Sequence, residues 1–86
     1  MKKVNIPEDF KKYVIASEIY LNGERVRLQF TNGYGASVIH HDVSYGLELA
    51  VLYKNNLCYS TDITHDVIGH LNQEELEMYL GRIKDL

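Results

Sequence analysis

The segment from Thr31 to Leu71 constrains the fold more than any other part of the chain. It consists of short runs typical of β-strands, separated by Gly and Asn, which read TNGYGASVIHH, SYGLELAVLYKNN and LCYSTDITHDVIGHL. Short strands joined by tight turns predict an antiparallel sheet, because a parallel pair needs a much longer crossover connection.

Two Asn-Gly pairs predict tight turns in the first half of the chain. Asn22-Gly23 follows a β-prone run over Tyr13–Leu21, and Asn32-Gly33 precedes another over Tyr34–His41. Asn-Gly suits a two-residue hairpin turn because both central residues of that turn need positive φ. A third turn over residues 54–56 is expected before a short last strand, Leu57–Ser60.

The strands also carry a pattern of apolar faces. In the first strand Ile15, Ile19 and Leu21 share one face, and Leu47–Tyr53 is a nearly continuous apolar run typical of a central strand. Gly35 within the third strand predicts a bulge or a close backbone contact.

Two short helices are predicted. Pro7, followed by two acids, is typical of a helix start, so a short N-terminal helix is expected to end near Lys12. Thr64 can cap a second short helix through Ile68, with Gly69 at its C-terminal end.

A longer helix is predicted at the C-terminus. Asn72 with Glu75 three residues later forms a capping-box pattern, and an apolar stripe at helical spacing follows. The stripe is Leu76, Tyr79, Leu80 and Ile83, and the sheet residues expected beneath it are Val26, Leu28, Phe30, Leu49 and Val51. We therefore expect a single α+β domain over residues 1–86. It is an antiparallel meander of about five strands packed by a C-terminal helix, with a short helix at the N-terminus and one after the last strand.

Cys58 is the only cysteine, so the chain cannot form an internal disulfide. Small secreted domains usually depend on several disulfides. The chain also lacks an apolar signal segment after Met1 and has no apolar run of the roughly 18 residues that a membrane-spanning helix needs. We therefore expect a soluble cytoplasmic protein without a membrane partner.

The charge is unevenly distributed along the chain. Residues 1–41 carry six basic and four acidic side chains, whereas residues 42–86 carry eight acidic and three basic ones. Between Asp62 and Glu77 there are five acids and neither Lys nor Arg. Such a field repels a phosphate backbone and attracts basic protein surfaces.

Metal binding and catalysis are the first alternatives to consider. The ligand-type residues are His40, His41, Asp42, Cys58, His65, Asp66 and His70. Neighbouring residues of a strand point to opposite faces, so His40 and His41 are not expected to share an ion. No Cys pair or HxxxH pair is present, and no nucleophile has a local signature. The expectation is a non-enzymatic protein without a cofactor or metal, with a metal-dependent enzyme as the weaker alternative.

Direct nucleic-acid binding has one supporting feature. Arg25 and Arg27, with Lys12, can share the outer sheet face with Tyr20 as a small basic and aromatic patch. So few cations neutralise little phosphate charge. We therefore interpret this face as solvated cross-strand charge pairs with Glu18 and Glu24, and expect no direct nucleic-acid partner.

Protein recognition is the remaining class. A loop around Tyr45 is expected to expose an aromatic side chain close in sequence to the acidic segment, which suits docking to a basic partner. An ordinary solvated acidic helix would contain the same residues. The residues expected to take part are Asp42, Tyr45, Asp62, Asp66, Glu74, Glu75 and Glu77.

A set of ordered motifs supports a family resemblance over about residues 31–86. The motifs are GYGASVI, SYG followed by LELAVL, YSTDITHDVIGHL, a Glu pair and a terminal L-x-x-I-x-x-L. Together they resemble small accessory proteins of tailed bacteriophages and prophages. The chain departs from that pattern in a shorter loop before Leu47 and in His65, where the related proteins more often carry an acid.

The resemblance implies a bacteriophage or prophage accessory protein that works in the cytoplasm of a bacterial host. The leading hypothesis is a protein that binds and inhibits a host protein, such as an anti-CRISPR or another counter-defence inhibitor directed at a nucleic-acid-binding complex. The alternative is a structural, assembly or self-associating phage protein, which includes a homodimer.

Overall fold

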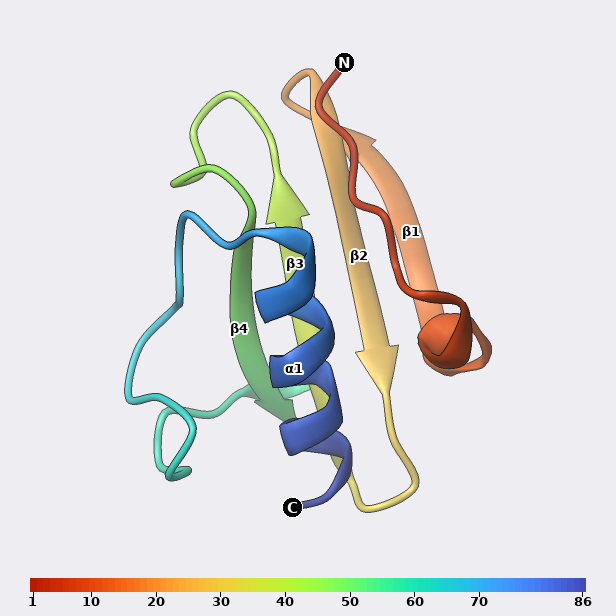
Figure 1. Cartoon of the computed structure of the whole chain (residues 1–86), viewed down its shortest axis with the longest axis vertical. Helices are drawn as coiled ribbons and strands as arrows, with labels where there is room; N and C mark the ends of the chain where they lie inside the picture. Colours follow the sequence, from red (N-terminus) through yellow and green to blue (C-terminus); the bar gives the residue numbers. More distant parts are fainter.

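The computed structural model describes residues 1–86 as an antiparallel sheet with one α-helix on one face (Figure 1). The strands follow one another in the order β1-β2-β3-β4-β5. The elements are a 3-10 helix η1 (Glu8–Tyr13), β1 (Val14–Tyr20), β2 (Gly23–Gln29), β3 (Tyr34–His40), β4 (Glu48–Tyr53), β5 (Asn56–Leu57) and α1 (Gln73–Lys84). The predicted meander and C-terminal helix are therefore confirmed.

The first hairpin turn lies one residue earlier than predicted. Leu21 and Asn22 have the positive φ angles, 47° and 58°, and Gly23 is the first residue of β2. Gly23 is needed for another reason: a Cβ there would lie 1.9 Å from the carbonyl oxygen of His40. Because β3 approaches this closely, only glycine fits at position 23 of the strand, and the two turn residues are Leu21 and Asn22.

The second turn differs from a two-residue hairpin. Only Gly33 has a positive φ, 88°, and Phe30 N donates to Tyr34 O at 2.8 Å, so the loop contains three residues. This is a common three-residue hairpin geometry, with the glycine in the left-handed region. The close backbone contact predicted for Gly35 is confirmed, because a Cβ there would lie 2.1 Å from the Leu28 carbonyl oxygen.

The core lies between α1 and the sheet. The predicted stripe residues Leu76, Leu80 and Ile83 are fully buried, and Tyr79 packs at the margin. The five sheet residues expected beneath the stripe all belong to this core, together with Val4 and Phe10 from the N-terminal segment. Each fully buried aliphatic side chain contributes about 1.5–3 kcal/mol by leaving water.

Both ends of α1 are held by polar side chains. The predicted capping box is present: Asn72 Oδ1 accepts from Glu75 N at 2.8 Å, and Glu75 Oε1 accepts from Asn72 N at 3.0 Å. At the other end Asn32 Nδ2 donates to the carbonyl oxygens of Ile83 and Lys84, each at 3.0 Å. The β2–β3 turn therefore satisfies carbonyl groups that a helix terminus leaves without intrahelical partners.

The predicted helix over residues 64–68 is wrong. Ile68 instead forms an isolated antiparallel bridge with Leu49, with two backbone hydrogen bonds of 2.9 Å. The extended backbone is favoured here because it supplies hydrogen-bond partners for the Leu49 N–H and C=O groups on the side of β4 that faces away from β3. Thr64 caps no helix, and its hydroxyl donates to Asp66 O. Gly69 ends no helix either. A glycine is needed there because a Cβ would meet the Cβ of Tyr45 at 2.8 Å.

Two further elements differ from expectation, and one predicted apolar face is exposed. The N-terminal helix is a single 3-10 segment, and the last strand is reduced to Asn56–Leu57. Ile15, Ile19 and Leu21 remain exposed. These residues are exposed because the core beneath α1 extends only as far as β2. Of β1, only Val14 packs against the margin of that core.

We predict opposite effects for the same substitution at two glycines. Gly23→Ala should lower the free energy of unfolding by about 1–3 kcal/mol, because the new methyl group meets backbone atoms of His40 and His41. Gly81→Ala in α1 has open space around it and should raise stability by about 0.5–1 kcal/mol. Urea unfolding measures both values, and equal effects of the two substitutions would contradict this account of the first hairpin.

Candidate functional site

The predicted interaction residues fall into two regions. The loop between β3 and β4 lies toward the same end of the molecule as the N-terminus of the chain and the start of α1 (Figure 1). Asp42 and Tyr45 belong to this loop, and Glu74, Glu75 and Glu77 belong to the first turns of α1. Asp62 follows β5, which pairs with the opposite end of β4, so the structure separates Asp62 from this group.

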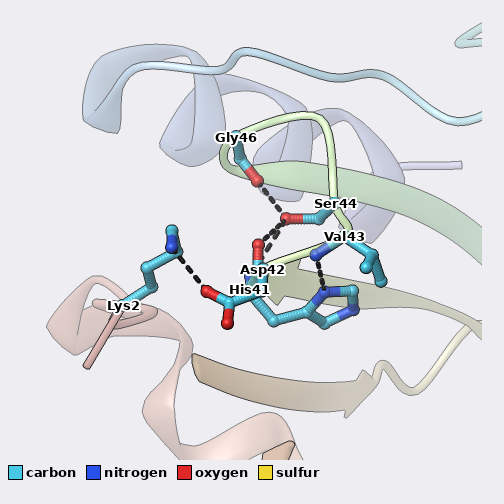
Figure 2. A network of polar contacts seen from close by, with 6 residues as sticks. All are labelled: Lys2, His41, Asp42, Val43, Ser44 and Gly46. Carbon is cyan, nitrogen blue, oxygen red and sulfur yellow. Dashed lines mark hydrogen bonds and ion pairs between the residues drawn. The ribbon is translucent and has the colours of Figure 1, made fainter. Parts of the chain in front are cut away.

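A network of hydrogen bonds holds the β3–β4 loop from within (Figure 2). Ser44 Oγ accepts from His41 N at 3.0 Å and donates to the Gly46 carbonyl oxygen at 2.7 Å. His41 is buried, and its Nδ1 accepts from Val43 N at 3.2 Å.

A second set of contacts holds the loop against neighbouring segments. Tyr45 N donates to the buried Glu48 carboxylate at 2.9 Å, and Tyr45 O accepts from His70 N at 2.7 Å. Leu71 N donates to Leu47 O at 2.9 Å. The loop is therefore connected to the residues directly before α1, and its geometry depends on where the helix packs.

The side chains at the loop surface contrast with this bonded backbone. Val43 is 71% exposed and Tyr45 is 65% exposed. Leu21 of the β1–β2 turn is 43% exposed and lies beside this loop, because Asp42 N donates to Leu21 O at 2.9 Å. We call Leu21, Val43 and Tyr45 the apolar tip. Of these three residues, only Tyr45 was predicted from the sequence as an interaction residue. Leu21 was not, because no local pattern indicates that it lies beside a loop that begins about twenty residues later.

The acids predicted to take part in recognition are engaged to different degrees. Asp42 pairs with Lys2 at 2.7 Å, and Glu75 is used in the capping box. Asp66 accepts from Val67 N at 2.7 Å. Glu74 and Glu77 are exposed and form no ion pair or side-chain hydrogen bond. These two carboxylates are therefore the uncommitted charges of the first helical turns.

The histidines and Cys58 occupy separate places. His40 Nδ1 lies 3.1 Å from Lys3 O, and His65 Nδ1 lies 2.8 Å from Tyr59 O. His40 and His41 contact different neighbours, although β3 ends at His40 and His41 belongs to the following loop instead of the predicted strand. A hydrogen bond from Ser60 lowers the pKa of the partly exposed Cys58 thiol. The structure contains no group of three His, Cys, Asp or Glu side chains placed to hold a metal ion, and no pocket.

The outer sheet face carries partnered cations. Arg25 pairs with Glu18, as predicted, and its guanidinium lies 4.7 Å from the centre of the Tyr20 ring. Arg27 donates to Asn55 at 3.1 Å. Glu24 does not join these pairs, since its carboxylate accepts from Val4 N at 2.8 Å. Lys12 does not belong to this face: it lies in η1, over the ring of Tyr13, which packs against the core.

The twelve-residue α1 is too short and polar to cross a bilayer, and the chain has no other α-helix.

The Lys2–Asp42 pair predicts a measurable pKa change. The hydrogen bond and charge of Lys2 hold the pKa of Asp42 below its ordinary value of 3.8. A carboxyl with a lowered folded-state pKa stabilises the fold above its unfolded pKa, and this contribution is lost as pH falls through the folded value. Lys2→Met should therefore raise the pKa of Asp42 in an NMR titration. Lys3→Met is the control, and an unchanged Asp42 titration in Lys2→Met would contradict the pairing.

Comparison of the chain with protein-family models, with curated proteins and with solved structures finds no match.

Proposed function

We propose that this protein is a non-enzymatic binding module that docks on a basic surface of a partner protein. The apolar tip would enter the interface, and the carboxylates of Glu74 and Glu77 would face cations of the partner. The observation that carries the proposal is the β3–β4 loop, whose polar groups are bonded internally while Val43 and Tyr45 point to solvent.

The bonded loop favours binding because it is already ordered. Association costs free energy for every loop and side chain that must be immobilised, and a preorganised loop avoids part of that cost. Tyrosine is enriched among residues that dominate interface energies, because its ring buries a large area with few rotatable bonds. Tyr45 at 65% exposure therefore suits the role of an anchor.

The exposed carboxylates supply selectivity for a basic partner. Charges at the rim of an interface mainly raise the association rate and exclude partners of the same sign. Glu74 and Glu77 have no cation of this chain to neutralise them, in contrast to Asp42. The binding should therefore weaken as salt rises, because exposed charges are screened over about 8–10 Å at physiological ionic strength.

The family resemblance of residues 31–86 suggests a specific form of this function. A bacteriophage or prophage accessory protein of this size would act in the host cytoplasm by covering a basic surface of a host protein. A nucleic-acid-binding defence complex presents such a surface, so the inhibitor would compete with nucleic acid for it. Fold and size alone do not select the target among host proteins.

The proposal predicts that two variants lose the same partner. Tagged wild-type protein should capture a stoichiometric partner from bacterial lysate, and Tyr45→Ala should weaken its binding by about 30-fold, the loss expected for an interface anchor. Glu74→Lys with Glu77→Lys should slow association and reverse the salt dependence. Glu75 is left unchanged because it caps α1.

Matched controls separate this site from general surface effects. Tyr59→Ala removes an exposed tyrosine from the segment after β5, and Glu8→Lys with Asp9→Lys reverses two acids in η1. Neither control should change partner binding. Capture that is equal for wild type, Tyr45→Ala and the helix double variant would refute docking through this end of the molecule.

A further inference from the structure

β1 is the open edge of the sheet. At the opposite side, β4 is paired by β5 and by Ile68, and Cys58 N donates to Val51 O at 2.9 Å. The N–H of Val14 donates to Lys11 O at the end of η1, and the backbone groups of residues 15–20 make no hydrogen bond outside the pairing with β2. Alternate residues of an antiparallel strand point their N–H and C=O groups to either side, so about half of these groups face solvent.

This edge lacks most features that prevent pairing with another strand. Natural edge strands are usually short or carry Lys, Pro or an inward-pointing charge. β1 has seven residues, VIASEIY, with neither Lys nor Pro. Its only charge, Glu18, is held by Arg25 of the neighbouring strand. The irregularity between Val14 and Ala16 affects only the first part of the strand.

Two isoleucines along this edge are exposed without a partner in the chain. Ile19 is 72% exposed and Ile15 is 52% exposed. Alternation places Ile19 on the face that carries α1, because Ser17, two residues before it, is paired with the core residue Val26. Ile15 lies at the irregularity between Val14 and Ala16. An exposed apolar row beside free backbone groups is the combination that favours strand addition.

We propose that two copies of this chain associate through β1, antiparallel across a twofold axis, to form one continuous ten-stranded sheet. A seven-residue strand pairs with itself over its whole length only when the axis passes its fourth residue, Ser17. In that register Ile19 lies opposite Ile15 of the partner subunit, and the same contact occurs a second time by symmetry. A twofold interface requires such self-complementarity.

Charge favours the same register. With the axis at Ser17, Glu18 lies opposite Ala16 of the partner subunit, and no two like charges face each other. With the axis at Glu18, the two carboxylates would lie directly opposite, which destabilises a cross-strand pair. With the axis at Ile19, only the last part of β1 would pair. The sequence of β1 therefore favours pairing with the β1 strand of a second copy in the register whose twofold axis passes Ser17.

Variants at the two edges of the sheet test the dimer. Wild-type protein should sediment with a concentration-dependent mass that approaches twice the 9.9 kDa of one chain. Ile19→Lys should give a folded monomer, because Ile19 is exposed in the single chain and a Lys on an edge strand hinders pairing. Leu57→Lys places the same charge on β5, where the side chain is 60% exposed, and should remain dimeric.

Isotope-filtered NMR on a mixture of labelled and unlabelled chains tests the register. Contacts between Ile19 and Ile15 of the partner subunit are expected. A wild-type protein that is monomeric at every concentration would overturn the proposal. A dimer that survives Ile19→Lys, that is lost equally in Leu57→Lys, or whose intersubunit contacts lie away from β1 would also overturn it. None of these readouts depends on the partner of the apolar tip.

Discussion

The packing of one short helix on a five-stranded sheet is the constraint on which the rest of this structure depends. A twelve-residue helix is about 18 Å long and about 10–12 Å wide with its side chains. Neighbouring strands are about 4.8 Å apart, so such a helix covers two or three strands. The core beneath α1 accordingly draws its fully buried sheet residues from β2, β3 and β4, and β1 lies outside it.

A helix of this length needs support from outside itself. Isolated helices of 12–15 residues are marginal in water, because the first turn is costly to form. Here the support comes from distant segments: Asn32 binds carbonyl groups at the C-terminal end, and Gln73 Nε2 donates to Asn5 O at 2.6 Å near the start. The turn between β2 and β3 therefore contributes to the stability of the helix as well as to the hairpin.

The limited coverage by α1 produces two different kinds of free surface. At the end of the sheet, the β3–β4 loop satisfies its polar groups internally and leaves apolar side chains outward, which suits side-chain recognition of another protein. Along β1 the unsatisfied groups belong to the backbone, which suits pairing with another strand. Every buried side-chain nitrogen and oxygen of the chain has a hydrogen-bond partner. The proposed functions therefore lie on the two surfaces that the fold leaves incomplete.

Local patterns in the sequence were sufficient for the first four strands, the capping box at Asn72 and Glu75, and the stripe of α1, because these depend on residues within a few positions of one another. They also placed Tyr45 in an exposed loop. Two local interpretations were wrong where a tertiary contact competed with the local preference: the turn at Asn22-Gly23 and the helix over residues 64–68. In the first case β3 approaches Gly23 too closely for any other residue, and in the second Ile68 bonds the edge of β4.

The candidate surfaces divide in the same way. By itself, the sequence determined that the chain is a small α+β protein whose second half is acidic and carries an exposed tyrosine, since composition and periodicity report burial and charge. Only the tertiary structure decided that Leu21 lies beside the β3–β4 loop, that Lys2 pairs with Asp42, that Asp62 lies apart, and that β1 has a free edge. Each of these depends on which segments meet in space, and contacts over twenty to forty residues leave no periodic trace in the chain.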